Sequence, residues 1–166
     1  MSLDYNEYID QLNLEPHPEG GYFKETYRSS THLENLNNFE GPRNCSTAIY
    51  FLLTNDSKSH LHRIKSDEMW HFYAGDPLKV VMLNQNGEYR ETIIGPDLKR
   101  GQVFQFLVPK GCWFGAEVLE GGTFSLVGCT VSPGFDFSDF ELADRKTLSQ
   151  SFPQHQSFIE EFCLKT

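Results

Sequence analysis

The chain has 166 residues, a length that predicts one domain large enough to bury an apolar core. Its formal net charge of −9 argues against a basic surface of the kind that binds nucleic acid or anionic membranes. Aromatic residues are abundant, with 14 Phe, 7 Tyr and 2 Trp, which favours β-structure. The four cysteines form no CxxC pair, so we interpret them as reduced, mostly buried thiols.

The N-terminal segment carries acidic residues where a secretory signal would need positive charge. No stretch approaches the ~20 apolar residues that cross a bilayer, so we expect a cytoplasmic protein. Apolar residues between Leu3 and Leu14 predict a short amphipathic helix, which Pro16 and Pro18 would end.

From Gly20 to Pro133, short segments rich in β-forming residues alternate with turn residues. The nine expected strands are Tyr22–Ser29, Thr47–Thr54, Leu61–Ile64, Glu68–Ala74, Leu78–Asn84, Tyr89–Ile94, Val103–Val108, Cys112–Leu119 and Thr123–Val131. Most connections are too short for the crossovers that parallel strands need, so the pattern predicts an antiparallel sandwich or barrel. Residues 31–44 are expected to form a surface loop.

After Pro133 and Gly134 the pattern becomes helical, and two short helices are expected at Asp144–Phe152 and His155–Leu164. They would cover one end of the barrel or one face of a sheet. The predicted organisation is therefore a single domain over residues 1–166, with a barrel core at about 20–133 and a helical segment at 138–165.

The segment from Ser59 to Gly75 carries the strongest chemical signal. His60 and His62 are two residues apart and would face the same side of a strand, where Glu68 on the next strand could join them. Two imidazoles and a carboxylate are a donor set for a divalent metal such as Zn, Fe, Mn or Ni. His71 follows Glu68 by three residues, so it would face the opposite side unless the strand bulges.

These motifs resemble those of the cupins, and the chain as a whole looks like the cupin 5 family. The first cupin motif is matched by His60, His62, Glu68 and Gly75, and the second by Pro109 and Gly111, with Phe114 where its histidine would stand. The closer match rests on the blocks His17–Gly21, Asp67–His71, Gly75–Leu78 and Thr130–Phe135, among others.

The resemblance implies an all-β fold, a small antiparallel jelly-roll barrel or double-stranded β-helix, with the short terminal helices added. It also implies a homodimer formed by exchange of N-terminal strands, for which the sequence offers Tyr22–Ser29. It does not imply one activity, because cupins include dioxygenases, isomerases, sugar epimerases, storage proteins and regulators.

Two chemical roles for the site stay open. In the first, His60, His62 and Glu68 are metal ligands, although Phe114 removes a fourth donor and makes the wall apolar. In the second, His62 is an acid–base group held by a neighbouring carboxylate, as suggested by the similarity of Leu61-His62-Arg63 to the catalytic-base step of dTDP-sugar 3,5-epimerases. Under this reading, His62→Ala would remove activity and leave the fold intact.

The candidate site residues follow from these readings. The candidate catalytic residues are His62, Glu68 and His71, and the candidate ligand-binding residues are His60, Arg63, Trp70, Phe72, Tyr73, Lys79 and Phe114. Arg63 or Lys79 would hold an anionic group of the ligand. We interpret His17 and Glu19, in a Pro/Gly-rich turn, as a structural corner.

Three classes of function remain for the sequence. The first is a small-molecule enzyme, either isomerase- or epimerase-like or metal-assisted, acting on a sugar- or keto-acid-like ligand. The second is a ligand-binding or sensing module that needs no metal, and the third is a scaffold for dimerisation. The expected partners are a small-molecule ligand and a second copy of the chain, with no nucleic acid and no membrane.

Overall fold

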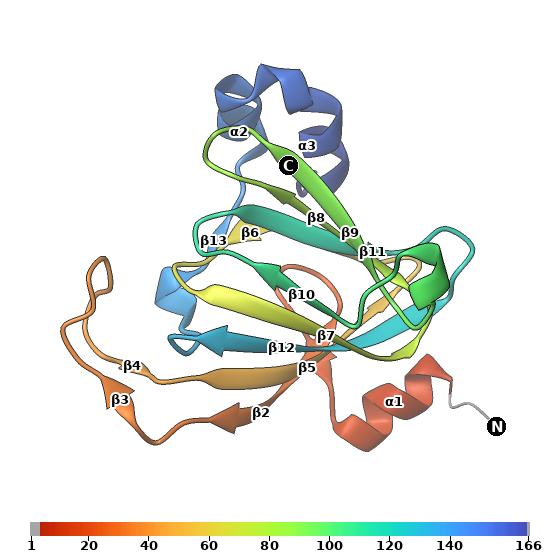
Figure 1. The fold of residues 1–166 in the computed structure, drawn as a ribbon, viewed down its shortest axis with the longest axis horizontal. Coiled ribbons are helices and arrows are strands. Elements are labelled where there is room, and N and C mark those ends of the chain that lie inside the picture. The colour runs from red at the N-terminus through yellow and green to blue at the C-terminus, as the bar shows by residue number, and fades with distance from the viewer. Residues whose placement is uncertain (1–3, 166) are drawn as a thin grey trace.

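The computed structural model describes residues 4–165 and contains two antiparallel sheets packed face to face (Figure 1). The strands of the first sheet, in spatial order, are β1 (Glu15–Pro16), β2 (Tyr22–Arg28), β5 (Thr47–Thr54), β12 (Phe124–Ser132), β7 (Asp67–Gly75) and β10 (Gln105–Val108). Those of the second are β13 (Glu141–Leu142), β6 (Lys58–Arg63), β11 (Trp113–Val118), β8 (Leu78–Leu83) and β9 (Tyr89–Ile94). The predicted antiparallel all-β fold is confirmed.

The main core lies between the two sheets, because alternate residues of each strand point inward. In β8, Leu78, Val80 and Met82 belong to this core, whereas Val81 and Leu83 face the other way. Those two residues are also buried, because the C-terminal helices cover the outer face of the second sheet. β8 therefore lacks the apolar–polar alternation of a strand with one wet face.

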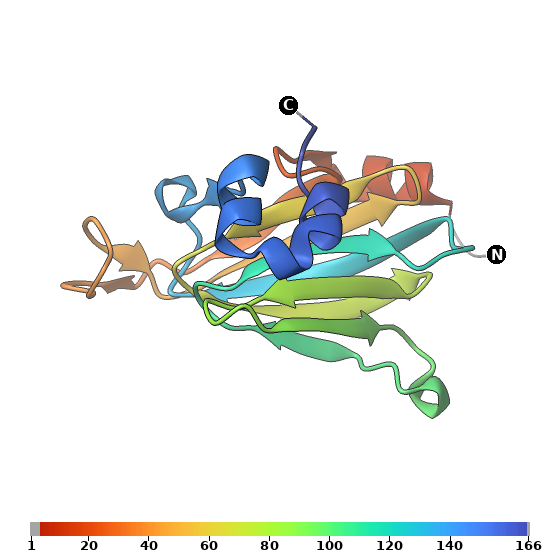
Figure 2. The same cartoon turned by 90° about the horizontal axis from the view of Figure 1, so that it is seen from above.

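Helices cover both outer faces of the sandwich, with the blue C-terminal helices above the sheets and the red N-terminal helix below them in Figure 1. Figure 2 looks down on the face that the C-terminal helices cover. On the six-stranded sheet lies α1 (Tyr5–Leu12), whose N-terminus has a capping box between Asp4 and Glu7. On the five-stranded sheet lie α2 (Arg145–Ser151) and α3 (Gln156–Phe162), as the helical pattern predicts. Residues 4–165 also contain three short 3₁₀ helices, η1 (Leu98–Arg100), η2 (Phe137–Asp139) and η3 (Pro153–His155). Leu3, which was predicted to belong to the N-terminal helix, lies outside the described residues. No helix within residues 4–165 is long and apolar enough to span a membrane.

The segment expected to be a surface loop contains a small hairpin of β3 (His32–Leu33) and β4 (Arg43–Asn44), which projects from the sheets (Figure 1). Arg43 is buried and forms an ion pair with the buried Asp139 of η2, with 2.7 Å between Nε and Oδ2. The interpretation as a surface loop was therefore incomplete, because this ion pair attaches the hairpin to the segment that follows β12.

A β-bulge in β6 changes which histidine faces the barrel interior. Opposite β11, Phe114 pairs with His62 and Ala116 with Ser59, so β6 carries one extra residue across this step. Because the bulge breaks the alternation, His62 is buried between the sheets, while His60 is half-exposed and does not line the same cavity. The prediction that the two imidazoles share a face is wrong.

Candidate functional site

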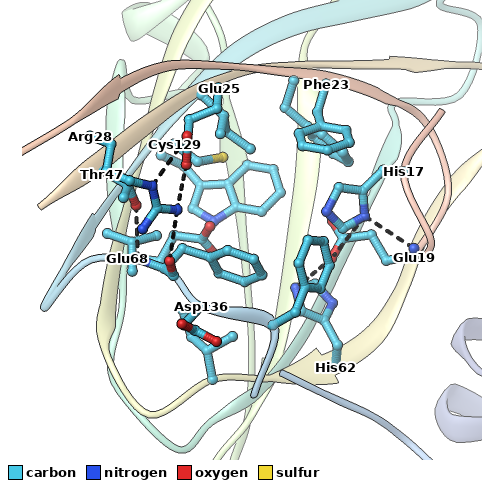
Figure 3. A pocket seen from close by; sticks show the side chains of 17 residues that line it. His17, Glu19, Phe23, Glu25, Arg28, Thr47, His62, Glu68, Cys129 and Asp136 are labelled. Carbon is cyan, nitrogen blue, oxygen red and sulfur yellow. Dashed lines mark hydrogen bonds and ion pairs between the residues drawn. The ribbon is translucent and has the colours of Figure 1, made fainter. Parts of the chain in front are cut away.

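A cavity of about 440 Å³ lies inside the barrel, between the sheets (Figure 3). Five aromatic side chains lie on its wall, namely Phe23, Phe51, Trp70, Phe135 and Phe137. Its polar lining consists of His17, Glu19, Glu25, Arg28, Thr47, His62, Glu68, Cys129 and Asp136. An apolar cavity with a few converging polar groups has the usual composition of a small-molecule site.

Glu19 and His62 form a buried ion pair on the cavity wall. The distance between His62 Nε2 and Glu19 Oε2 is 2.8 Å, and Ser59 Oγ donates to Glu19 Oε1 at 2.8 Å. Burial alone would raise the pKa of Glu19 and lower that of His62, but the attraction between them reverses both directions. The pKa of Glu19 is therefore lowered and that of His62 raised, so the pair exists as carboxylate and imidazolium.

Both ring nitrogens of His62 are occupied by protein groups. Nε2 donates to Glu19, and Nδ1 donates to the carbonyl oxygen of His60 at 2.7 Å. His62 in this state has no lone pair to take a proton from a ligand. It contributes a fixed positive charge to the cavity instead.

The turn that carries Glu19 depends on glycine. Gly20 has a φ of 111°, and a Cβ at this position would overlap the carbonyl oxygen of Lys58 in β6. The absence of a side chain lets the turn lie against β6, where His60 N donates to the carbonyl oxygen of Glu19 at 2.9 Å. This close approach brings the carboxylate of Glu19 to His62.

His17, from the same turn, points its ring into the cavity (Figure 3). Its Nδ1 accepts a hydrogen bond from the backbone N–H of Glu19 at 3.1 Å, and burial lowers its pKa against the opposing effect of the Glu19 carboxylate. His17 is therefore neutral at pH 7, with its proton on Nε2. The ring packs edge-on against Phe23, with 4.6 Å between centroids.

Glu68 is the polar group whose bonding the protein leaves incomplete. It lies in β7 between Val108 and Val131 of the neighbouring strands, is buried, and lines the cavity. Its Oε2 has no hydrogen-bond partner among the described residues, and neither has the indole nitrogen of Trp70 two residues along. Burial raises the pKa of Glu68 to about 7, against the lowering effect of the His62 charge.

Arg28 and Glu25 of β2 form a second ion pair on the lining of the cavity. Arg28 Nη2 lies 2.6 Å from Glu25 Oε1, and both side chains are partly exposed. The same guanidinium donates to Asn44 Oδ1 at 2.8 Å and to the carbonyl oxygen of Phe135 at 3.0 Å. Arg28 thereby ties β2 to the β3–β4 hairpin and to the segment after β12.

Only part of the predicted site comes together in this cavity. His62, Glu68 and Trp70 line it, and Phe114 is buried directly behind His62, with 4.1 Å between ring centroids. Phe72 is partly buried against the main core, without lining the cavity.

The other candidates lie elsewhere. His71 is on the outer face of the six-stranded sheet, within hydrogen-bond distance of Thr130 and Gln105, and stacks on the exposed Tyr73. Because β7 keeps its alternation between Glu68 and His71, the two face opposite sides. His60 Nδ1 lies 2.7 Å from the carbonyl oxygen of Glu19, outside the cavity.

The two cations expected to hold an anionic group are also outside the cavity. Arg63 pairs with Glu141 at 2.8 Å and lies over the ring of Trp113. Lys79 pairs with Glu117 at 2.6 Å on the face covered by the C-terminal helices. Neither lines the wall that Glu68 faces.

The donor set expected for a metal is not assembled. The bulge turns His60 away, Glu19 occupies Nε2 of His62, and Phe114 supplies no donor. Within residues 4–165, no cluster of three His, Cys, Asp or Glu side chains has a geometry that could hold a metal ion. The residues present therefore do not fit the metal centre that the cupin motifs suggest.

Sequence reasoning missed several residues of the cavity. Glu19 and His17 were interpreted as a corner, and Arg28, Glu25 and Asp136 were not considered for the site. One signal was present, since the block His17–Gly21 contains His, Glu and two glycines and was among the motifs that carried the family resemblance. The role of this block in the cavity depends on the packing of the turn against β6, which brings Glu19 to His62.

The model of the family Cupin_5, described as Cupin superfamily (DUF985), matches residues 6–143. The chain belongs to this cupin family. A hypothetical protein from Leishmania major is 38% identical with a TM-score of 0.93, and the match covers 98% of this cupin and 100% of that chain. Protein SO0799 from Shewanella oneidensis is 41% identical with a TM-score of 0.90, covering 99% of this cupin and 100% of that chain.

The uncharacterized protein YML079W from Saccharomyces cerevisiae is 34% identical over 142 residues, which are 79% of this cupin and 71% of that protein. A more distant neighbour is oxalate decarboxylase from Bacillus subtilis, with a TM-score of 0.55 at 15% identity, covering 91% of this cupin and 37% of that chain. That likeness shows the fold alone. The names of these nearer relatives state no activity.

Proposed function

We propose that this cupin is an isomerase-like enzyme that moves a proton on a small carbonyl compound bound in the cavity, with Glu68 as the acid–base group. One observation carries the proposal. Glu68 is a buried carboxyl group with an unpartnered oxygen, and it lies on the wall of a cavity of about 440 Å³. A buried acceptor without a partner costs stability, so its retention is explained if a ligand supplies the partner.

The environment of Glu68 suits proton transfer near neutral pH. A carboxyl group with a pKa of about 7 exists as acid and base in similar amounts, which is the condition for efficient general acid–base catalysis. As a base, the carboxylate takes a proton from a carbon beside a carbonyl group. The electron pair of that C–H bond forms a C=C bond, and the π pair of the carbonyl moves to its oxygen to give an enolate. As an acid, it returns the proton to another atom of the same intermediate.

Three neighbouring groups support this chemistry. The imidazolium of His62 already lowers the pKa of Glu68 through its charge, so its field reaches the reacting region. It would stabilise the negative charge of the enolate. The indole N–H of Trp70 also acts on Glu68, whose pKa it lowers, and it makes no other hydrogen bond among the described residues, so a ligand oxygen would compete with Glu68 for this donor. His17 offers the N–H of its Nε2 from the turn.

The test is proton exchange between substrate and solvent. The protein is incubated in deuterated buffer at pH 7 with a panel of small carbonyl compounds, and loss of the proton beside the carbonyl is followed by NMR. For a substrate that exchanges, Glu68→Gln should slow exchange by about 10²- to 10⁴-fold, the usual contribution of a general base. Glu141→Gln is the matched control, because Glu141 is exposed, pairs with Arg63 and lies outside the cavity.

Two results would contradict the proposal. The first is exchange that Glu68→Gln leaves at the wild-type rate. The second is a compound that binds in the cavity and depends on Glu68 for affinity, with no exchange by any bound compound. That second result would assign the cavity to ligand binding without turnover.

A further inference from the structure

The lining of the cavity carries more acidic groups than cations. Four carboxyl groups face it, from Glu19, Glu25, Glu68 and Asp136, against two cations, Arg28 and His62. His17 is neutral, as its lowered pKa indicates. The charge of the site therefore disfavours an anionic ligand.

Both cations are already paired with carboxylates. His62 Nε2 lies 2.8 Å from Glu19, and Arg28 Nη2 lies 2.6 Å from Glu25. The remaining hydrogen bonds of Arg28 go to Asn44 and to the backbone of Phe135, so little of its donor capacity is left for a phosphate or carboxylate. An anionic ligand would have to displace a carboxylate that the protein holds in place.

The two other carboxyl groups form no ion pair among the described residues. Asp136 accepts hydrogen bonds from Ser138 at the start of η2. Glu68 keeps an oxygen without a partner inside the cavity. The protein group left for the ligand to bind is therefore a hydrogen-bond acceptor, which is either a neutral or an ionised carboxyl group. A cationic N–H group can donate a hydrogen bond to the carboxyl group in either state.

Aromatic rings line the same cavity as this acceptor. Trp70 stands edge-on to Phe51, with 5.9 Å between centroids, and Phe135 stands edge-on to Phe137 at 4.9 Å. These four side chains and Phe23 line the cavity. Flat apolar walls suit a planar ligand body, and the negative faces of aromatic rings attract cations.

We propose that the cavity selects a planar organic cation, of the amidinium or protonated-amine class, with an N–H group that binds the unpartnered Oε2 of Glu68 and leaves the other carboxyl oxygen available for proton transfer. This inference rests on the proposed function in one respect, that Glu68 faces the ligand, and it narrows the ligand to a charge and a shape. It also replaces the expectation of a keto-acid ligand, because that ligand would need a free cation.

Three probes of nearly identical size separate the charge classes: benzamidine is cationic, benzamide neutral and benzoate anionic. Their dissociation constants are measured by titration followed by protein NMR at pH 8. We expect benzamidine to bind about tenfold more tightly than benzamide, because its hydrogen bond to the carboxyl group is strengthened by charge. Benzoate should bind more weakly than both. Glu68→Gln should remove the preference for benzamidine, whereas Glu141→Gln should keep it.

Three results would overturn the inference: benzoate binding as tightly as benzamidine, benzamide matching benzamidine in the wild-type protein, or no binding of benzamidine at millimolar concentration. If Glu68→Gln does not fold, the order of the three probes on the wild-type protein decides alone. The order of the three dissociation constants is an equilibrium property and does not depend on catalytic turnover. The inference can therefore fail while Glu68-dependent proton exchange persists, and it can hold when exchange is absent.

Discussion

Glu68 occupies a position that is unfavourable for folding and favourable for proton chemistry. Its pKa rises from 4.5 in a solvated chain to about 7 in the folded protein. The native state therefore binds more protons than the unfolded state between these two values, and the free energy of unfolding falls as pH rises through this range. A shift of this size corresponds to a cost of roughly 3 kcal/mol above pH 7.

Removing the charge of Glu68 should therefore stabilise the protein. We expect Glu68→Gln to raise the free energy of unfolding at pH 8.5 by about 1–3 kcal/mol, and to have a smaller effect at pH 5, where the native carboxyl group is already protonated. Urea denaturation at the two pH values measures this. Glu141→Gln, an exposed change of the same type, should stay within about 0.5 kcal/mol. A Glu68→Gln protein less stable than wild type at pH 8.5 would contradict the account.

The ion pair of His62 and Glu19 makes a different contribution. Because both ring nitrogens of His62 bind protein groups, the structure indicates a positioning and electrostatic role instead of the free catalytic base expected from the sequence. Its removal would leave the buried Glu19 carboxylate with Ser59 as its remaining side-chain partner at hydrogen-bond distance.

We expect His62→Ala to lower the free energy of unfolding by about 3–5 kcal/mol, the usual effect of breaking a buried pair on one side. This prediction differs from the intact fold that the sequence alone led us to expect for this variant, because the sequence did not indicate the pairing of His62 with Glu19. The double variant Glu19→Gln with His62→Ala should recover part of the loss, since no unpaired charge remains. Urea denaturation of the single and double variants at pH 7 measures both effects. A loss below 1 kcal/mol for His62→Ala would mean that the pair is not a structural element.

At the scale of elements, the bulge in β6 decides which histidine enters the cavity. Gly115 of β11 faces the bulge, and a Cβ there would approach the carbonyl oxygen of Ser59 to 2.6 Å. A glycine inside a strand is a recognised sign of close backbone approach or of a bulge. The sequence prediction assumed strict alternation from His60 to His62 and took no account of Gly115. The prediction that both histidines are metal ligands followed from that assumption.

Restoring the missing cupin histidine should not restore a metal site. We expect Phe114→His to bind no stoichiometric zinc, because His60 remains outside the cavity and Glu19 still occupies Nε2 of His62. Zinc titration of untagged protein by calorimetry measures this, with the wild-type protein as the control. Binding of one equivalent by the variant would show that His62 exchanges Glu19 for a metal.

The longer elements could be predicted from the sequence because their patterns are long enough to be unambiguous. The strands at Thr47–Thr54 and Tyr89–Ile94 have the predicted bounds. The two-residue strands β1, β3, β4 and β13 are too short for any periodicity, so they were missed. Glu68 and Trp70 were found because β7 is regular where they lie, whereas Glu19 and Arg28 reach the cavity through tertiary packing that local patterns do not encode.

At the scale of the whole molecule, β2 leaves an edge of the six-stranded sheet open. β1 pairs only with Tyr22 and Phe23, so Lys24–Arg28 have no further strand beside them in the described part of the chain. An open edge is a ready site for pairing with a second chain. We propose a homodimer joined through this N-terminal edge. Sedimentation at micromolar concentration should show twice the mass of the chain, and a species of one chain mass would contradict the proposal.

The proposed enzyme depends on one buried carboxyl group that changes its protonation near neutral pH while facing a ligand cavity. The direct measurement is an NMR titration of protein labelled with ¹³C at the glutamate carboxyl carbon, with Glu68→Gln used to assign the resonance. The Glu68 signal should titrate with a pKa of about 7. A midpoint near 4.5, the value of a solvated glutamate, would contradict this prediction.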